Sequence, residues 1–195
     1  MAFNKIDSLN CESLELFNVD IPCGGIMGGV KEVYINFRDN IASISASADG
    51  ESISAIALTV DVGTGDVNTF KKFSFRPQTA SLTSTATVDN ASGSGQIQSD
   101  LILQFNKYGD TDKRLAIQSL MIAKGLVAIV RTNEDDFVFL GMDNDVYVSA
   151  STSQTGTAFT DGSYYNITLT DISKSLPYSI DSAWFLANID NLVEI

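Results

Sequence analysis

The segment TASLTSTATVDNASGSGQIQSDLILQF, residues 79–105, contains two runs in which apolar and polar side chains alternate, separated by the small polar loop DNASGSG. Alternation with a period of two is typical of β-strands, because successive side chains of a strand point to opposite faces. Two such runs joined by a short glycine-containing loop predict an extended β-hairpin. One face of this hairpin would be modestly apolar, and the other would be a surface of Ser, Thr and Gln. The apolar positions are Ala80, Leu82, Ala86, Val88, Ile97, Leu101, Leu103 and Phe105.

Much of the remaining chain is also strand-like. The apolar run in residues 126–132 (LVAIVRT) is expected of a buried strand. Residues 136–142 and 145–151 flank the turn Asp143–Asp145 and predict a second hairpin. Residues 176–192 are apolar enough to dock as a last strand or to pair with a neighbour. In total, about ten to twelve strands predict a mainly β fold. Other strands are expected at residues 30–37, 53–60, 70–77 and 163–172.

One segment, residues 111–124 (TDKRLAIQSLMIAK), predicts an α-helix that flanks the β structure. Aspartates at its start can cap free backbone amides. A lysine in the last turn and Gly125 directly after it favour a helix end there. The apolar positions follow a spacing of three to four residues and are Ile117, Leu120 and Met121.

Length and charge limit the classes of protein. A chain of 195 residues and 21.0 kDa predicts a single domain over residues 1–195, with residues 1–20 as an N-terminal arm. The formal net charge is −12, so a surface that grips phosphate backbones is disfavoured. The sequence shows no secretory signal and no stretch apolar enough to cross a membrane, which predicts synthesis in a reducing cytoplasm. Cys11 and Cys23 are then expected to be free thiols.

Residues 21–35 (IPCGGIMGGVKEVYI) contain two glycine pairs ahead of an expected strand, and glycine-rich loops beside strands can bind phosphate. Gly24 and Gly29 have the spacing of a P-loop, but Val30 stands where the lysine is required. The segment also leads into a strand, whereas an anion site of this kind needs the N-terminus of a helix. These glycines are therefore predicted to be structural.

The sequence contains no histidine, which removes Ser-His and Cys-His pairs and the commonest general base near neutral pH. A hydrolase that uses only carboxylates stays open, because Glu134, Asp135 and Asp136 are consecutive. Their place beside a predicted turn is more typical of solvated acids. We therefore predict that the protein is not an enzyme and has no catalytic or cofactor-binding residues.

Residues 143–154 (DNDVYVSASTSQ) begin like a calcium-binding loop, with acids at the first and third places. The later places disagree with that motif, since Val148 replaces the glycine and Gln154 the bidentate acid. Two cysteines without histidine also do not make an ordinary zinc site. No metal site is predicted.

Several segments together resemble virion proteins of gut bacteriophages, including crAss-like phages. The resemblance starts with CGGIMGGVKEVYINFRDNI and continues through the predicted hairpin, FSFRPQTASLTSTATVDNASGSGQIQSDLILQF. It then includes the helix RLAIQSLMIAKG, the strands of LVAIVRTNEDDFVFLGMDNDVYV and the closing YYNITLTDISKSLPYSI. The similarity covers roughly residues 20–182 and is one of pattern and order, without a single diagnostic motif.

The resemblance implies a tail-tube or tail-ring fold, which is a small β-sandwich or barrel flanked by one helix and carrying a long hairpin. Copies of it join their sheets into a continuous inner barrel. Residues 79–105 match the hairpin that lines such a channel, with the face toward the lumen left open. The expected function is a structural virion subunit of a ring-shaped tail tube, tail barrel or connector through which DNA passes. Its partners would be identical copies in a closed ring, of six or twelve subunits, and adjacent tail, neck or portal proteins.

Two other functions remain open at this point. One is another virion component, such as a head decoration or neck protein. The second is a monomeric β-sandwich that binds carbohydrate or another surface, for which Tyr164, Tyr165 and Trp184 could stack on sugars.

Overall fold

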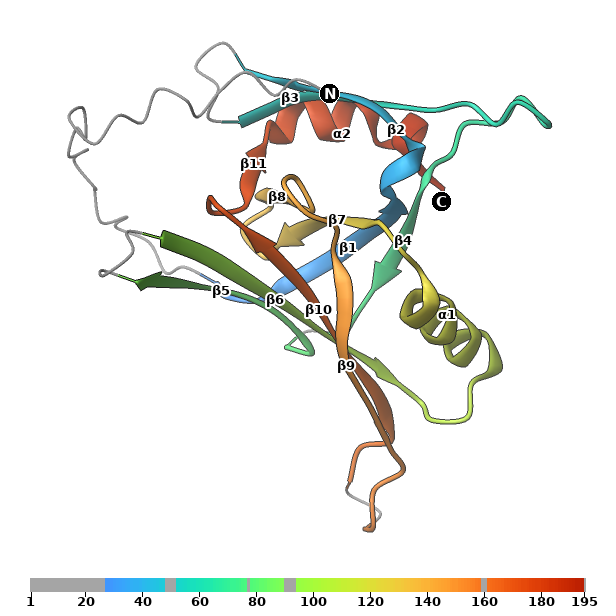
Figure 1. Ribbon diagram of the computed structural model, residues 1–195. Coiled ribbons are helices and arrows are strands. Elements are labelled where there is room, and N and C mark those ends of the chain that lie inside the picture. The colour runs from blue at the N-terminus through green and yellow to red at the C-terminus, as the bar shows by residue number, and fades with distance from the viewer. Residues whose placement is uncertain (1–26, 48–51, 77, 90–93, 159–160, 195) are drawn as a thin grey trace.

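The computed structural model describes residues 27–47, 52–76, 78–89, 94–158 and 161–194 (Figure 1). The expected N-terminal arm and both cysteines lie outside the described residues. Within the described ranges there are twelve strands, two α-helices and one short 3-10 helix. The strands are β1 (Val30–Phe37), β2 (Ile41–Ala46), β3 (Ser52–Leu58), β4 (Phe70–Ser74), β5 (Ala80–Asp89), β6 (Ser94–Asn106), β7 (Leu126–Thr132), β8 (Phe137–Leu140), β9 (Tyr147–Gln154), β10 (Tyr164–Ser173), β11 (Tyr178–Ile180) and β12 (Val193–Glu194). The helices are α1 (Thr111–Ile122) and α2 (Ser182–Leu192), and the 3-10 helix is Arg38–Asn40.

The strands form two sheets, which confirms the mainly β, sandwich-like fold. The larger sheet has eight strands in the order β12-β4-β1-β7-β8-β11-β3-β2. The smaller sheet has four strands in the order β5-β6-β10-β9, and all its neighbours are antiparallel. Figure 1 shows the larger sheet bending so that α2 lies between β2–β3 and β7–β8.

The predicted hairpin of residues 79–105 is present as β5 and β6. Ala80 lies opposite Leu103 at its base, and Asp89 lies opposite Ser94 near its tip. On its other side β6 pairs with β10 over ten residues, from Tyr164 to Ser173. The hairpin is thus one half of the four-stranded sheet.

Two apolar cores explain which side chains alternate and which do not. The first core lies between the two sheets and includes Leu101, Leu103 and Ile167, together with residues of α1. The second core lies between the larger sheet and α2 and includes Ile53, Phe70 and Phe185. The strand β7 contributes to both cores, which is why its sequence is apolar without alternation.

Helix α1 forms where the sequence predicts it and ends two residues earlier, at Ile122. The carboxylate of Asp110 accepts a hydrogen bond from the backbone N–H of Lys113, as a cap does. Ile117 and Leu120 are buried against the first core, whereas Met121 is exposed. Two of the three predicted apolar contacts of this helix are therefore made.

The expectation of a closing strand over residues 176–192 is wrong for most of that segment. Only Tyr178–Ile180 are extended, as β11, and Ser182–Leu192 form the helix α2. Asp181 caps the helix by accepting hydrogen bonds from the N–H groups of Ala183 and Trp184. The bend of the larger sheet leaves a space that a helix fills, and a second flanking helix is the result.

The second predicted hairpin is also wrong. Strand β8 pairs with β7 and β11 in the larger sheet, whereas β9 pairs with β10 in the smaller one. Residues 141–146 are thus a link between sheets. The guanidinium of Arg38 holds this link by donating to the carbonyls of Gly141 and Met142, at 2.6 and 2.8 Å. The buried carboxylate of Asp171 accepts the N–H of Gly141 at 3.2 Å.

Gly141→Ala tests the geometry of this link. Gly141 has φ of +95°, and an added Cβ would lie 3.1 Å from Cγ1 of Val127 and 3.2 Å from the carbonyl oxygen of Leu126. We expect the free energy of unfolding to fall by about 1–3 kcal/mol in urea denaturation, because strain and overlap add. Gly28→Ala is the control, since its Cβ would meet nothing within 4 Å. Equal stability of the two variants would contradict the prediction.

Candidate assembly surface

The four-stranded sheet ends in two long strands whose outer sides are open. Strand β5 has ten residues and pairs only with β6, and β9 has eight residues and pairs only with β10, among the residues that the structure describes. An edge strand presents unpaired backbone N–H and C=O groups, which can pair with another chain. The sheet therefore carries two potential interfaces, one at each side.

Neither edge has the chemistry that usually blocks such pairing. Natural edges are commonly protected by lysine, proline or short length. Strands β5 (ASLTSTATVD) and β9 (YVSASTSQ) contain no lysine, arginine or proline. Asp89 is the only charged residue in either strand, and one bulge, at Ser149, interrupts the pairing of β9 with β10. Both edges are therefore open to pairing with a further strand.

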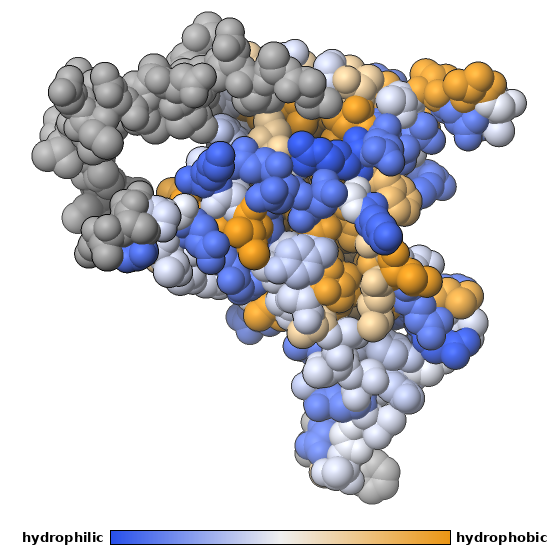
Figure 2. All heavy atoms as spheres, viewed as in Figure 1, coloured by the Kyte–Doolittle hydropathy of each residue, from blue (hydrophilic) through white to orange (hydrophobic). Residues whose placement is uncertain are grey.

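The two faces of this sheet differ in polarity. One face is packed on the core between the sheets and has Leu101, Leu103, Ile167 and Leu169 fully buried. The opposite face is mostly polar, and Figure 2 shows the hairpin end of β9 and β10 in white and blue with little orange. Its polar side chains include Ser81, Thr83, Thr85, Thr87 and Asp89 of β5, Ser94, Gln96, Gln98, Asp100, Gln104 and Asn106 of β6, Asn166, Thr168 and Thr170 of β10, and Thr152 and Gln154 of β9.

Hydrogen bonds connect polar side chains across this face. The hydroxyl of Thr170 donates to the carboxylate of Asp100 at 2.6 Å, and it lies 2.8 Å from the hydroxyl of Ser149. The amide of Gln98 donates to the same carboxylate at 2.9 Å. The network spans three strands, so it holds the side chains of the polar face in place.

No positive charge lies in the four strands of this sheet, because all twelve lysines and arginines of the chain are elsewhere. Several gather on the larger sheet around Glu32. The carboxylate of Glu32 accepts hydrogen bonds from Tyr34 at 2.7 Å and Arg131 at 3.0 Å, and it pairs with Lys72 at 2.7 Å. Burial raises the pKa of Glu32, but the hydrogen bonds from Lys72, Tyr34 and Arg131 outweigh burial and lower it to about 2.

This cluster predicts a specific acid sensitivity. A carboxyl group whose pKa is lowered on folding stabilises the protein above its unfolded pKa of 4.5, and the contribution is lost as pH falls toward 2. The shift corresponds to about 3 kcal/mol. We therefore expect the stability advantage of the parent protein over Glu32→Gln to disappear between about pH 5 and pH 2 in denaturation curves. Glu194→Gln, which removes an exposed ion pair with Lys71, should show a change below ~0.5 kcal/mol.

Two of the three consecutive acids, Glu134 and Asp135, have carboxylates that bind neighbouring groups. Asp135 is bound in ion pairs with Lys31 and Arg131, and the hydrogen bond from Lys31 keeps its pKa below the usual range. Glu134 accepts the backbone N–H of Met27. The backbone carbonyl of Asp136 accepts from Thr132 within the β7–β8 turn. Two of these carboxylates thus already hold basic or backbone groups.

The acids of the calcium-like segment are likewise used to hold the link between the sheets. Asp143 accepts the backbone N–H of Lys174 at 3.0 Å, and Asp145 lies 3.6 Å from the guanidinium of Arg38. Within the described part of the chain, no three His, Cys, Asp or Glu residues come close enough together to hold a metal ion.

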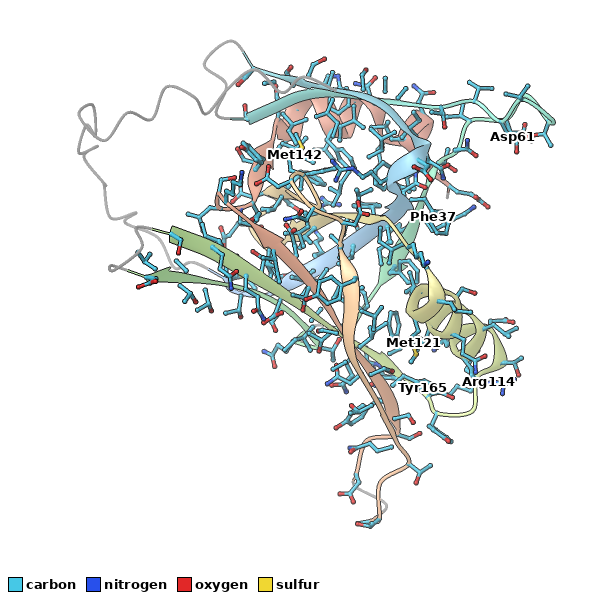
Figure 3. All side chains as sticks on the ribbon, viewed as in Figure 1. Phe37, Asp61, Arg114, Met121, Met142 and Tyr165 are labelled. Carbon is cyan, nitrogen blue, oxygen red and sulfur yellow. The ribbon has the colours of Figure 1, made fainter. Side chains whose placement is uncertain are left out.

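The aromatic residues considered for sugar stacking do not lie together. Trp184 packs on the second core from α2. Tyr165 is buried below the loop before α1, as Figure 3 shows, and its hydroxyl accepts the N–H of Gly109 at 3.2 Å. Its ring stacks on Tyr108 with the centroids 5.1 Å apart. Tyr164 and Tyr108 both line a hollow at the tip of β9 and β10.

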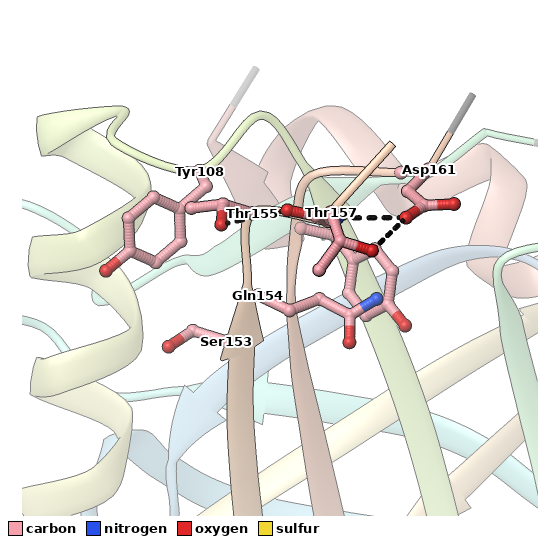
Figure 4. A pocket seen from close by; sticks show the side chains of 9 residues that line it. Tyr108, Ser153, Gln154, Thr155, Thr157 and Asp161 are labelled. Atoms are coloured by element: carbon pink, nitrogen blue, oxygen red, sulfur yellow. Dashed lines mark hydrogen bonds between the residues drawn. The ribbon is translucent and has the colours of Figure 1, made fainter. Parts of the chain in front are cut away.

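That hollow has a volume of about 770 Å³ and is lined mainly by polar residues, which include Gln154 and Thr155 (Figure 4). One carboxylate oxygen of Asp161 accepts three hydrogen bonds inside it, two from backbone N–H groups and one from the hydroxyl of Thr157. These bonds lower the pKa of Asp161. The hollow continues from the end of β9, and no motif in the sequence points to it.

The glycine segment is structural where the structure describes it. Gly29 has φ of +106°, and Asn133 donates from its side chain to the carbonyl of Gly28 at 2.7 Å. Val30 then begins β1, so no helix N-terminus follows the glycines. Gly24 lies outside the described residues.

No helix in the described ranges has the length and apolarity that crossing a membrane requires. No protein-family model matches this chain, and no curated protein is significantly similar to it.

Proposed function

We propose that the protein is a non-enzymatic structural subunit of a phage virion that forms a ring in the tail tube, tail barrel or connector. The observation that carries the proposal is the pair of open edges on the four-stranded sheet. Each edge is long, and neither contains lysine, arginine or proline. A ring needs two different complementary surfaces on every subunit, and β5 and β9 are such a pair.

The direction of the strands supports closure by rotation. The sheet has four antiparallel strands, so β5 and β9 run in opposite directions. A copy rotated about a ring axis keeps its strand directions, and its β5 therefore lies antiparallel to β9 of the copy before it. The antiparallel order of the sheet then continues from copy to copy into one barrel. Hydrogen bonds between strands and burial of the edges supply the free energy of association.

The polar face is the one that would line the channel. The opposite face is covered by the core between the sheets over most of β6 and β10 and at the base of β5. A lumen of Ser, Thr, Gln and Asn, with Asp89 and Asp100 as acids and no cation in its strands, offers phosphate groups no attractive charge. DNA can pass such a wall without being retained, because retention of DNA depends mainly on lysine and arginine.

In this function the protein assembles in the host cytoplasm, and adjacent tail, neck or portal proteins contact the ring. A head decoration or neck protein remains the closest alternative, since it would use the same sheet edges in another setting. The polar hollow beside Tyr164 supports a second alternative, a monomer that binds carbohydrate.

Light scattering and negative-stain microscopy of the purified protein, alone and with its virion neighbours, test the proposal. We expect closed rings or tubes. With strand spacing of ~4.8 Å and a tilt near 40°, a barrel of six copies is about 50 Å wide between opposite backbones, and one of twelve about 100 Å. A 21.0 kDa monomer in both preparations would contradict the proposal. Binding of that monomer to an oligosaccharide array would favour the second alternative.

A further inference from the structure

The four-stranded sheet is skewed by a constant step. Each paired residue of β5, β10 and β9 can be given the number of the β6 residue at the same level of the sheet, because the strands are paired residue by residue, with β9 related to β6 through β10. Strand β5 covers positions 94–103, β6 covers 94–106, β10 covers 97–106 and β9 covers 100–106. The midpoints of these ranges are 98.5, 100, 101.5 and 103, so each strand is displaced by 1.5 residues from the one before it.

Copies of a skewed sheet can close into a barrel whose strands are all evenly staggered. This requires the displacement between β9 of one copy and β5 of the next to equal the displacement between neighbouring strands within each copy. For a spacing of ~4.8 Å and a rise of ~3.3 Å per residue, a displacement of 1.5 residues corresponds to a strand tilt of about 46°. This tilt is near the upper end of the range of ~35–45° that is typical of barrels. If β5 of the next copy is displaced by the same 1.5 residues from β9, its centre lies at position 104.5. The centre of β5 in its own sheet is at 98.5, so the sheet is displaced by six residues from one copy to the next.

We infer that β9 of one copy pairs with β5 of the next copy in the register that places Thr152 opposite Thr85. The inference rests on the proposed ring and specifies its interface. Position 104.5 of β6 is at the level of the midpoint between Thr152 and Ser153 on β9. The centre of β5 is the midpoint between Ser84 and Thr85. Because the two strands are antiparallel, Thr152 then lies opposite Thr85 and Ser153 lies opposite Ser84. The register also keeps the faces together, with the two threonines on the polar face and the two serines on the core face.

An exposed apolar side chain supports this register. Val88 points to the core side of β5 but is 65% exposed. The bulge at Ser149 adds one residue to β9, which brings Val148 of the preceding copy opposite Val88. Val148 packs against the core between the sheets, so the pair extends that core across the interface. With Thr152 opposite Thr83, Val88 would pass beyond the first residue of β9 and stay exposed.

The hollow at the tip of β9 is consistent with the same alignment. In this register the beginning of the neighbouring β5, from Ala80 to Leu82, extends past Gln154 to the level of Thr155 and Gly156. Both of these residues line the hollow. The neighbouring chain therefore occupies the space beside it.

Cysteine pairs test the register in the assembled full-length protein. In a background with Cys11→Ser and Cys23→Ser, one variant carries Thr152→Cys with Thr85→Cys and a matched variant carries Thr152→Cys with Thr83→Cys. A third variant, Ser153→Cys with Ser84→Cys, samples the other face, because opposite pairs on the two faces of an antiparallel ladder differ in separation. Directly opposite positions are close enough for a disulfide, and positions displaced by two residues are not.

After mild oxidation, a non-reducing gel should show a ladder of covalent multimers for the Thr85 variant, the Ser84 variant or both, and monomer for the Thr83 variant. Light scattering under reducing conditions shows whether each variant assembles. A ladder with the Thr83 variant instead, or assembled protein without any ladder, would overturn the register and leave the proposed ring intact. Failure of the cysteine-free parent to assemble, both alone and with its virion neighbours, would overturn both the register and the ring.

Discussion

A proline in β9 should convert the assembled protein into a 21.0 kDa monomer when the N–H that it removes points away from β10. Adjacent N–H groups of an edge strand alternate between the neighbouring strand and the open side. Ser151→Pro and Thr152→Pro therefore affect the two sides separately. One of the two variants should keep the stability of the parent and lose assembly, since proline is tolerated where the N–H faces solvent.

The other variant of this pair should lose stability, because proline there removes a bond to β10 and costs about 3 kcal/mol or more. The expected pattern is thus one folded monomer and one destabilised protein, measured by light scattering together with urea denaturation. Every subunit carries the substitution, so each β9–β5 interface of the ring is weakened equally. A loss of ~3 kcal/mol at one interface lowers its association constant more than a hundredfold. Assembly of both variants at the level of the parent would show that β9 is not an interface.

Truncation of Phe185 should produce the largest loss of folding stability among the substitutions considered. Phe185 of α2 is fully buried. The centroid of its ring lies 4.5 Å from the ring centroid of Phe137 and 5.4 Å from that of Tyr34. Phe185→Ala removes these contacts and leaves a cavity at the centre of the second core. We expect the free energy of unfolding to fall by about 3–5 kcal/mol.

Leu186→Ala is the matched control, because Leu186 is the next residue of the same helix and is 45% exposed. Its truncation should cost less than ~1 kcal/mol, since nearly half of that residue's surface is already in water. Urea denaturation followed by circular dichroism measures both variants. Similar losses for the two would indicate that α2 is not anchored by Phe185 and would contradict the described core.

The helix α2 also illustrates a limit of sequence patterns. The run Trp184, Phe185 and Leu186 is apolar without a clear period, and on its own it is compatible with a strand. The cap at Asp181 is a helix signal that could have been used, since its carboxylate holds two N–H groups of the first turn. The choice between strand and helix depends on the space under β2 and β3, which exists only after the larger sheet has bent.

The link between β8 and β9 was missed for a related reason. Two strands separated by a turn of acids and an asparagine favour a hairpin locally. The contacts that prevent it come from distant parts of the chain, from Arg38 on one side and Asp171 on the other. Such contacts leave no trace in the local sequence, so the assignment of β9 to the smaller sheet could not be predicted.

The candidate assembly surface was predictable in part. The alternation in residues 79–105 indicated both the hairpin and its polar face, and the absence of lysine and proline is visible without a structure. The second edge could not be found in this way, because β9 becomes an edge only through its pairing with β10. The skew of the sheet, which defines the inferred register, likewise depends on pairings between strands far apart in the chain.

The amino-acid sequence by itself determined the features that arise within a few residues: the strands of period two, the capped helix α1, the hairpin turn and the acidic, histidine-free composition. These follow from the direction of successive side chains and from local hydrogen bonding. The tertiary structure alone decided which strands pair, that residues 182–192 are a helix, and which two strands are left as open edges. Those outcomes depend on burial and backbone pairing between distant segments, whose free energy is gained only when the whole chain has come together.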